Sequence, residues 1–465
     1  MDKNTEKKYS KLNEFASNME IWTQSFDRGL KKMRNEVFQI MKLPQAREVL
    51  VEKILAGDYE IAPPVINYID KKTGKFITKE QAAKTEKVRE IYVNGDVDRI
   101  VLNVIYRIYY EMYIDRISPY CVSYKTGVST SKIAKKLSKK LALLCNESKN
   151  NFLGYKIDIS KFFDSVNKET LFRALKELSS DDPIDELIRK YYADDRVTID
   201  GEIVPRYKSL AQGCALGCFL ADYVLKDIDE TLSSLDVIYY RYSDDIIILG
   251  KDAKLGYRIL LSMLRKKGLL VNPDKVESIR KDSWFTFLGF AFRKDQISLS
   301  EKTLKNIQHK VKTETMSVVR KAHKSATKKE VFHMITRLQN YFFTAYAADG
   351  KSFGMGNYLI STITSDHDLL EIETYCKDCL RAAYTGRTEI YGLGYVPYKE
   401  NYTIMHGKGK NVKRNLERTV GPEFEDFDLL RECGWVSLLH LRKCYRYSRP
   451  MYKSEIQKMM CRSYS

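Results

Sequence analysis

An adjacent pair of acidic residues inside an apolar, strand-forming run constrains this chain more than any other feature. Residues 240–249 read Tyr-Arg-Tyr-Ser-Asp-Asp-Ile-Ile-Ile-Leu. The runs Val237–Tyr240 and Ile246–Leu249 predict a β-hairpin that carries Asp244 and Asp245 at its bend. Clustered carboxylates beside a buried strand repel one another unless a cation or a raised pKa compensates them. The hairpin therefore predicts a divalent-metal site, because Mg²⁺ prefers hard oxygen ligands and shares them with substrate phosphates.

A second Asp-Asp pair in the chain provides an internal comparison. Asp194 and Asp195 also follow a tyrosine closely, but they lead into the polar stretch Arg196–Gly201 instead of an apolar run. We interpret this second pair as part of a solvated surface loop.

A third carboxylate for the predicted metal site is expected from another strand. In the segment Tyr155–Asp164, Asp158 alternates with Ile157 and Ile159. Successive side chains of a strand point to opposite faces, so Asp158 faces away from its two apolar neighbours. Asp158 and the Asp244 turn are therefore expected to meet.

Four motifs in one order resemble those of the reverse transcriptases, specifically the prokaryotic non-retroviral ones. They are Asp158, Gln212-Gly213, Tyr242–Asp245 and Phe287–Phe290. The resemblance implies an RNA-directed DNA polymerase, a nucleotidyltransferase that copies an RNA template into DNA from dNTPs with two Mg²⁺ ions. It also implies an α+β right-hand polymerase fold, with fingers, a palm built on an antiparallel sheet and a helical thumb, followed by a helical C-terminal region.

The resemblance assigns catalytic and metal-binding roles to five positions. Asp158 and Asp244 are expected to hold the two Mg²⁺ ions, with Asp245 supporting them and the backbone carbonyl of Ile159 as a further metal ligand. Lys275, in Asn-Pro-Asp-Lys, matches a basic residue proposed to protonate pyrophosphate.

The resemblance also places a set of residues against the substrate: Lys87, Arg89, Phe163, Gln212, Gly213 and Tyr242. Lys87 and Arg89 match a segment whose basic side chains clamp the triphosphate, a role that suits the forked guanidinium of arginine. Phe163 matches the aromatic residue that packs against the sugar 2′ position and favours deoxynucleotides. The alternatives are a solvated, charged strand for the basic pair and a core position for the aromatic ring.

Departures from the common pattern narrow the choice of group within the reverse transcriptases. After Gln212-Gly213 the chain continues as Cys214–Leu220, without the Ser-Pro that intron and retron enzymes usually show. The retron Val-Thr-Gly signature and a His/Cys-rich endonuclease tail are also missing. The chain looks more like the abortive-infection and defence-associated reverse transcriptases of bacteria, which implies a structured noncoding RNA partner and a role in antiphage defence. The alternatives are a retron or group II intron-type enzyme, or a catalytically silent RNA-binding scaffold.

Charge and composition agree with a nucleic-acid enzyme. The chain has 79 Lys and Arg against 61 Asp and Glu, a formal net charge of +18. A surface of that charge favours polyanions through counterion release, so affinity for nucleic acid should fall with salt. No apolar run approaches the roughly 20 residues that cross a bilayer, and the N-terminus lacks a secretory apolar segment. We therefore expect a cytoplasmic protein without a membrane partner, and a homo-oligomer is left open.

Periodicity and resemblance together predict five regions. These are an N-terminal helical extension (1–55), fingers (56–150), a palm (151–300), thumb-like helices (301–350) and a helical C-terminal region with a basic loop (351–465). The helices expected from apolar spacing are Val101–Tyr113, Ser131–Leu144, Leu255–Lys267, Lys302–Val319, Lys328–Tyr346 and Asp366–Tyr384.

Two basic segments and a set of tyrosines carry further expectations. The helix Ser131–Leu144 has one apolar face and several lysines on the others, which either track a phosphate backbone or are solvated. The basic loop His406–Arg414 is a candidate RNA contact. Synthesis starts either on an RNA hydroxyl or on the protein itself, and the candidate protein primers are Tyr445, Tyr447, Tyr452 and Tyr464.

Overall fold

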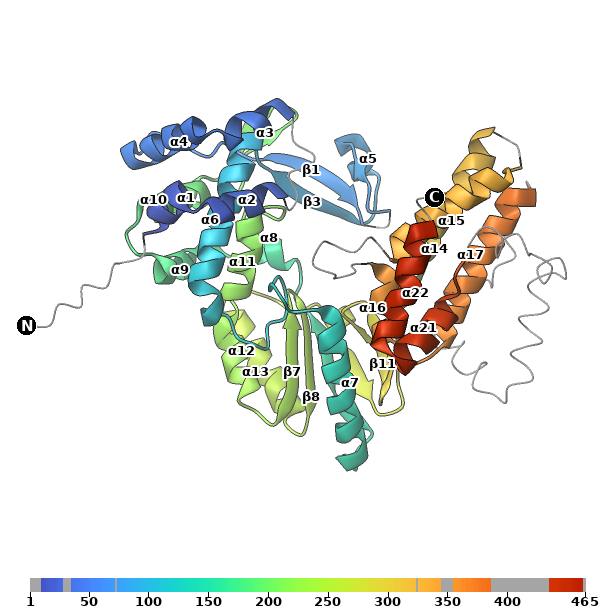
Figure 1. The fold of residues 1–465 in the computed structure, drawn as a ribbon. Helices are drawn as coiled ribbons and strands as arrows, with labels where there is room; N and C mark the ends of the chain where they lie inside the picture. The colour runs from blue at the N-terminus through green and yellow to red at the C-terminus, as the bar shows by residue number, and fades with distance from the viewer. Residues whose placement is uncertain are drawn as a thin grey trace, which may run out of the picture. The chain divides into compact units, whose positions relative to one another are not determined.

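A computed structural model describes most of the chain, namely residues 10–27, 35–71, 73–322, 325–343, 354–385 and 435–462 (Figure 1). By residue contacts the chain divides into two compact units. The first unit comprises Met1–Thr126 and Gly154–Ser278, and the second comprises Gly127–Leu153 and Ile279–Ser465. The predicted α+β class is confirmed, because antiparallel sheets are combined with many helices. The five regions read from the sequence stay predictions, since the two units group residues by contact and not by role.

A four-stranded sheet with the order β7-β8-β4-β9 belongs largely to the first unit. Its strands are β7 (Val237–Tyr242), β8 (Asp245–Gly250), β4 (Phe152–Asp158) and β9 (Glu277–Arg280). β8 pairs antiparallel with both β7 and β4. Its isoleucines are fully buried, as the continuous apolar run after the acidic pair predicts.

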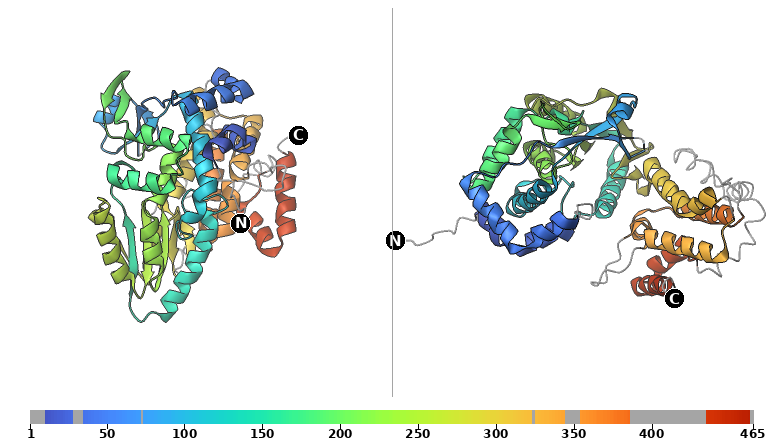
Figure 2. Two further views of the ribbon diagram at one scale, coloured as in Figure 1. Left: turned by 90° about the vertical axis from the view of Figure 1, so that its left-hand side faces the viewer. Right: turned by 90° about the horizontal axis from the view of Figure 1, so that it is seen from above.

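Two helices cover one face of this sheet (Figures 1 and 2). α12 (Lys226–Ser233) packs on β7, and α13 (Ala253–Lys266) packs on β8. In α13 the buried positions Gly256, Leu260 and Leu264 recur every four residues, so they form a single apolar face. The helix predicted at Leu255–Lys267 is therefore present, with its start two residues earlier.

A second sheet of the first unit carries Arg89, one of the residues expected to contact the substrate. Its strands follow the order β2-β1-β5-β6, and β3 also pairs with β1. β1 and β3 are antiparallel over six residue pairs, and β1 meets β5 in parallel. The bounds are β1 (Val65–Asp70), β2 (Phe76–Ile77), β3 (Val88–Val93), β5 (Arg196–Ile199) and β6 (Glu202–Pro205).

The long helix α6 (Asp96–Tyr113) forms the centre of the helical part of the first unit (Figure 1). Its buried residues contact α1 (Lys11–Ser17), α2 (Met19–Asp27) and α11 (Ala215–Tyr223), so the predicted N-terminal helices are part of this core. The remaining helices of the unit are α3 (Asn35–Lys42), α4 (Pro44–Ala56), α5 (Lys79–Ala83), η2 (Ile114–Arg116), α8 (Phe162–Ser165), α9 (Lys168–Leu178), α10 (Pro183–Ala193) and η3 (Pro273–Lys275).

The second unit combines a small antiparallel sheet with a set of helices (Figure 1). The sheet has the order β10-β11-β12, with β10 (Phe285–Phe287), β11 (Phe290–Arg293) and β12 (Gln296–Leu299). α7 (Thr130–Glu147) packs on β11, β12 and α16, although its sequence lies more than a hundred residues earlier than theirs. The other helices are α14 (Glu301–Ala322), α15 (Lys328–Phe342), α16 (Met355–Thr362), α17 (His367–Thr385), α21 (Leu438–Tyr447) and α22 (Arg449–Arg462).

The helices predicted for this unit are all present, with shifted ends. The predicted helix Lys328–Tyr346 is observed as α15, and its last predicted residues, 344–346, lie outside the described part of the chain. The basic loop His406–Arg414 and Tyr464 also lie outside it. Within the described ranges, no helix is both long and apolar enough to span a membrane.

Candidate active site

The predicted hairpin is present, and its turn is tighter than the sequence suggested. β7 continues to Tyr242, which pairs with Asp245, so only Ser243 and Asp244 lie between the strands. Ser243 has φ +56°, in the left-handed region that non-glycine residues rarely adopt. A two-residue hairpin loop needs such a positive φ to match the twist of its strands. The turn therefore places Asp244 at its tip, directly after the strained backbone of Ser243.

The structure brings the three predicted carboxylates to one end of the sheet. Asp158, the last residue of β4, is the direct strand partner of Asp245. Directly opposed residues of an antiparallel pair point to the same face, so these two side chains are neighbours. The backbone N–H of Ile159 donates to the carbonyl of Asp244 (3.1 Å), which ties the third acid to the same strand end.

Two lysines neutralise these carboxylates in the structure. The Nζ of Lys275 lies 2.5 Å from Oδ2 of Asp158, and the Nζ of Lys156 lies 3.5 Å from Oδ1 of Asp245. Burial raises the pKa of Asp244, and the charge of Asp158 raises it further. Burial is also the main cause that raises the pKa of Asp245 to about 6. The site thus favours added positive charge, as a carboxylate cluster does before it binds a cation.

The donor set fits a hard divalent ion. Asp158, Asp244 and Asp245 supply only oxygen ligands, the type that Mg²⁺ prefers. In the part of the chain that the structure describes, no three His, Cys, Asp or Glu side chains already converge on one point. Two of the three carboxylates instead turn to the lysine cations beside them, so metal binding requires these carboxylates to exchange one cation for another.

A buried charge network holds the turn from behind. The guanidinium of Arg241 is fully buried and donates to both carboxylate oxygens of Asp229, at 2.7 and 2.6 Å, and to Oδ1 of Asp222 (3.1 Å). Its Nη1 also donates to the carbonyl of Ser243 (3.2 Å), and the Ser243 N–H donates to Oγ of Ser123 (3.1 Å). Both backbone groups of the strained residue are therefore fixed. Sequence patterns gave no sign of this network, because its members come from distant segments.

A cavity of about 610 Å³ lies between the second sheet and the Gln212-Gly213 turn of the first unit. Arg89 and Gln212, both predicted to contact substrate, line it. The other cations on its wall are Lys71, Lys79, Lys161 and Arg206. The charge of Arg89 also lowers the pKa of Asp244, so a cation of the cavity wall acts electrostatically on this carboxylate. Sequence analysis missed Lys161, although it lies only three residues after Asp158.

Gly213 is required by a close approach of two backbones. Its φ is +117°, and a Cβ built on it would lie 2.7 Å from the carbonyl oxygen of Tyr92 in β3. The Tyr92 N–H in turn donates to the carbonyl of Gln212 (2.7 Å). This explains in physical terms why the Gln-Gly turn needs glycine, and it fixes Gln212 at the cavity wall.

The remaining predicted substrate residues have less specific surroundings. Lys87 is exposed just before β3. Phe163 is half-buried against the hydrophobic core and precedes Asp164, which lines the cavity. Tyr242 is half-buried, and its ring centroid lies 6.1 Å from that of Tyr124.

The comparison pair Asp194 and Asp195 lies in a different environment. Asp194 pairs with Arg196 (2.8 Å) and Asp195 with Lys168 (2.7 Å), and both cations are about half exposed. Each acid has an exposed cation of its own as its partner, so this pair is not a carboxylate cluster like that of Asp158, Asp244 and Asp245.

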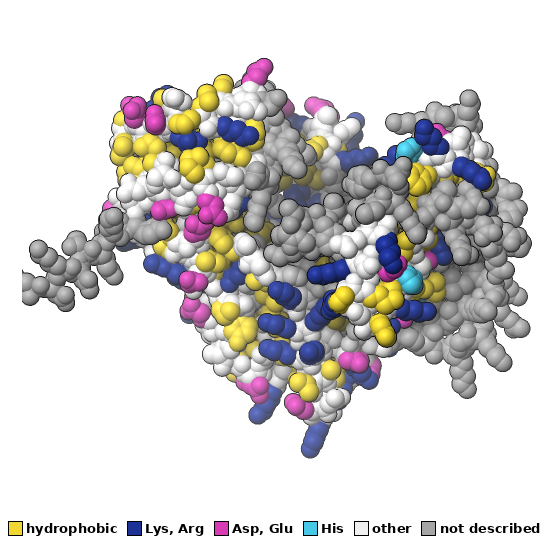
Figure 3. Space-filling model, in the orientation of Figure 1, with side chains coloured by type: hydrophobic (Ala, Val, Ile, Leu, Met, Phe, Trp, Pro, Cys, Tyr) yellow, Lys and Arg dark blue, Asp and Glu magenta, His cyan; other side chains and the backbone are white. Residues whose placement is uncertain are grey.

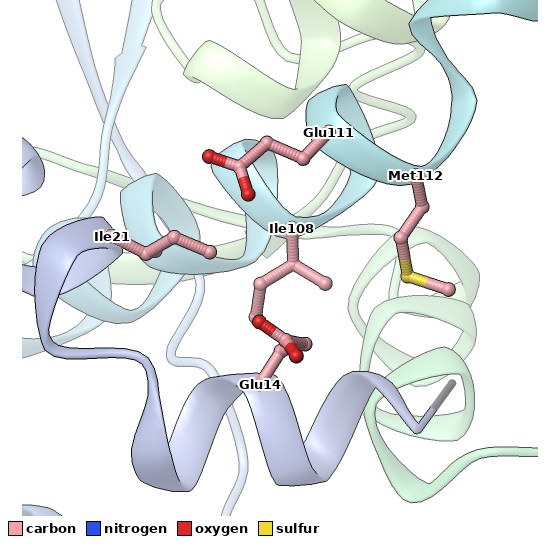
Figure 4. Close-up of a pocket in the computed structure, with 5 residues that line it drawn as sticks. All are labelled: Glu14, Ile21, Ile108, Glu111 and Met112. Atoms are coloured by element: carbon pink, nitrogen blue, oxygen red, sulfur yellow. The ribbon is translucent and has the colours of Figure 1, made fainter. Parts of the chain in front are cut away.

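A separate cavity of about 270 Å³ lies where the helices α1 and α2 meet α6 (Figure 4). Its lining combines the carboxylates of Glu14 and Glu111 with Ile21, Ile108 and Met112. Burial, and then the charge of Glu14, raises the pKa of Glu111. Two acids without a cation among the lining residues repel phosphate, so this cavity does not suit a nucleotide.

The family comparison agrees with the geometry. Residues 94–292 match the family model described as "Reverse transcriptase (RNA-dependent DNA polymerase)". These residues, less than half of the chain, are similar to a reverse transcriptase domain. A domain of this type marks an RNA-directed DNA polymerase, a nucleotidyltransferase. No curated protein matches the chain in sequence.

Among solved structures, telomerases are similar to the chain. Apo telomerase from Candida tropicalis without its C-terminal domain has 15% identity and a TM-score of 0.40, covering 54% of this chain and 59% of that one. Candida albicans telomerase in complex with a fragment of telomeric RNA has 15% identity and a TM-score of 0.36, covering 75% and 67%. Apo telomerase from Candida tropicalis has 11% identity and a TM-score of 0.46, covering 86% and 69%. All three TM-scores are below 0.5, so these likenesses say nothing of this chain's activity or partners.

Proposed function

We propose that the chain synthesises DNA on an RNA template from dNTPs, with two Mg²⁺ ions. The observation that carries this proposal is the meeting of Asp158 with Asp245 and Asp244 at one strand end, together with the basic cavity whose Arg89 acts on Asp244. Phosphoryl transfer depends mainly on positioning and on neutralising charge, and these residues supply both.

In this proposal each group has a defined task. Asp158, Asp244 and Asp245 would hold the metal ions, with the carbonyl of Ile159 as a further ligand. The ions, when bound, lower the pKa of the primer 3′-hydroxyl and neutralise the leaving pyrophosphate. Lys275, already 2.5 Å from Asp158, is placed to give a proton to the pyrophosphate.

The cavity residues would bind the incoming nucleotide. Arg89 pairs with phosphate oxygens through its fork, while Lys161 and Arg206 add positive charge on the same wall. Gln212 and Gly213 form the turn beside the nucleotide. Phe163 packs against the sugar 2′ carbon and excludes a hydroxyl there, while Lys87 and Tyr242 contact the substrate from the margin of the site.

The proposed biological role is antiphage defence with a structured noncoding RNA partner, in the cytoplasm. It is supported by the resemblance to defence-associated enzymes and by the basic net charge of +18. A retron or intron-type role is the alternative within the same chemistry. A silent RNA-binding scaffold is the alternative outside it, and the retained carboxylate cluster disfavours it, because such a cluster is costly without a cation.

The test of the chemistry is a matched pair of substitutions. Asp244→Asn keeps the side-chain shape and removes the charge, so dNTP incorporation on a primed RNA template should fall to background while the protein stays folded. Asp194→Asn makes the same change in the surface pair and should retain full synthesis. Synthesis by Asp244→Asn at the level of Asp194→Asn would overturn the assignment.

The test of the biological role uses the chain with its native flanking DNA. Expression should reduce phage plaque formation, and Asp244→Asn should abolish this protection. Full protection by Asp244→Asn would instead favour the scaffold alternative.

A further inference from the structure

The second unit contains a cavity of about 740 Å³ that none of the assigned roles explains. Four segments form its wall: α7, the start of β12, the end of α16 and α21. We call it the α7–α21 pocket. Its volume lies within the roughly 300–1,000 Å³ typical of small-ligand pockets. It is therefore large enough for one unpaired nucleotide.

One side of the α7–α21 pocket is positively charged. Lys135 and Lys139 reach it from α7, and Arg442 and Arg446 reach it from α21. Figure 3 shows Lys and Arg side chains gathered on the surface over α7. Neither Lys135 nor Lys139 has an ion-pair partner within the described ranges, so both charges are available to a ligand.

A buried arginine is only partly satisfied at the same place. Arg442 is 4% exposed, lies 2.9 Å from Asp366 through Nε, and donates Nη2 to the carbonyl of Ile363 (2.5 Å). Its Nη1 has no hydrogen-bond partner among the described residues. A buried donor without a partner is costly, so an acceptor entering the pocket is stabilised there.

The other side of the α7–α21 pocket is apolar. Ile297 and Ile360 are buried beneath it, and Leu143 lies 61% exposed on its rim. The half-exposed ring of Tyr445 completes this side, with the guanidinium carbon of Arg449 3.5 Å above its centroid. An aromatic ring and aliphatic side chains form the type of surface on which a nucleobase stacks.

We propose that the α7–α21 pocket binds one unpaired nucleotide of an RNA strand, with its phosphate on the basic side and its base on the apolar side. The site lies outside the metal-binding carboxylates and would anchor the RNA instead of taking part in the reaction. The inference rests on the proposed function, in that it deepens how this polymerase holds its RNA.

Charge complementarity favours a strand over a peptide. Asp366 is already paired with Arg442 and Arg446, and among the described residues of the wall Asp295 is the one acidic side chain. Lys135, Lys139 and the free donor of Arg442 thus leave an excess of positive charge that a phosphodiester matches. A peptide ligand would instead need acidic and apolar side chains together.

The test measures binding of a labelled oligouridylate of about 12 nucleotides to the full chain by fluorescence anisotropy at several salt concentrations. Lys135→Glu with Lys139→Glu should weaken binding about tenfold or more, because two attractive interactions become repulsive. The slope of log affinity against log salt should also fall by about 0.7, the amount expected for the one phosphate that the two lysines no longer neutralise.

A matched control comes from the same helix. Lys132→Glu with Lys136→Glu makes the same change of charge at exposed positions outside the pocket lining, and binding should change less than threefold. Leu143→Asp should weaken binding, because it removes apolar surface from the rim of the pocket. Because these positions are exposed or half-exposed, the variants should stay folded.

Equal effects of the two lysine pairs would overturn the proposal, because binding would then follow net charge alone. DNA synthesis is measured in parallel on a primed RNA. A pocket-specific effect without synthesis would refute the proposed function only. If the wild type synthesises DNA but the double variant Lys135→Glu with Lys139→Glu binds RNA as well as the wild type does, only the proposed role of the pocket is refuted.

Discussion

Arg241→Met should be among the most destabilising single substitutions in the first unit. The guanidinium is fully buried and joins Asp229 at 2.6 Å and Asp222 at 3.1 Å, and both acids are themselves buried. Methionine fills similar space but leaves two buried carboxylates without their cation. Breaking a buried ion pair in this way costs about 3–5 kcal/mol in the free energy of unfolding.

The loss should depend on pH in a defined direction. Burial raises the pKa of Asp222, and Arg241 opposes that shift. Without Arg241 the folded-state pKa of Asp222 rises further. A raised folded-state pKa gives stability that is present at low pH and lost as pH rises through that pKa. Arg241→Met should therefore be closer to the wild type at pH 5 than at pH 8.

The assay is urea unfolding at both pH values, with Arg196→Met as the control. Arg196 pairs with Asp194 at a similar distance, 2.8 Å, but at the surface, so its loss should be barely measurable. Arg241→Met should also need more Mg²⁺ for DNA synthesis, because the Ser243 carbonyl loses its donor and the turn loosens. Equal stability of the two arginine variants at pH 8 would refute the argument that the network supports the turn.

Three further substitutions test other parts of the structure. Phe163→Ala should raise the use of rNTPs relative to dNTPs in competition assays, and an unchanged ratio would make Phe163 a core residue only. Gly213→Ala should raise the KM for dNTPs at least tenfold, because its Cβ would lie 2.7 Å from a backbone oxygen, whereas Gly201→Ala, at φ +86° in open space, should not. Burial, and then the charge of Asp368, raises the pKa of Glu371 to about 7. Glu371 therefore contributes its full stability to the fold below its unfolded-state pKa, and this contribution is lost as the pH rises through about 7. Glu371→Gln should remove this loss of stability, which is on the order of 3 kcal/mol. The variant should therefore unfold at a higher urea concentration than the wild type at pH 8 but not at pH 5. Equal urea midpoints of the two proteins at pH 8 would contradict this.

The hairpin with Asp244 and Asp245 was predictable because its signals are local. An apolar run directly after two acids specifies a buried strand and its turn, and period-two alternation places Asp158 on the correct face. The expected sheet predicted that Asp158 and the Asp244 turn would meet, and the observed pairing of Asp158 with Asp245 agrees with that prediction.

What remained hidden depends on pairing between distant segments. Arg241 and Asp222 form part of one buried network, but an isolated arginine or aspartate in a sequence gives no sign of its partner. The same holds for α7: its apolar spacing predicts a buried face, but not that α16 and β12 would cover it.

The second unit is built from two separate segments of the chain, and this has a consequence for the order of folding during synthesis. All segments of the first unit have been translated once residue 278 has left the ribosome, so its acidic hairpin and basic cavity can form while residues 279–465 are still being made. α7 emerges early, but its partners in β11, β12 and α16 come far later. Its apolar face must therefore wait exposed, or be shielded by a chaperone, until these segments arrive. We expect the nascent chain to be most prone to aggregation during this interval.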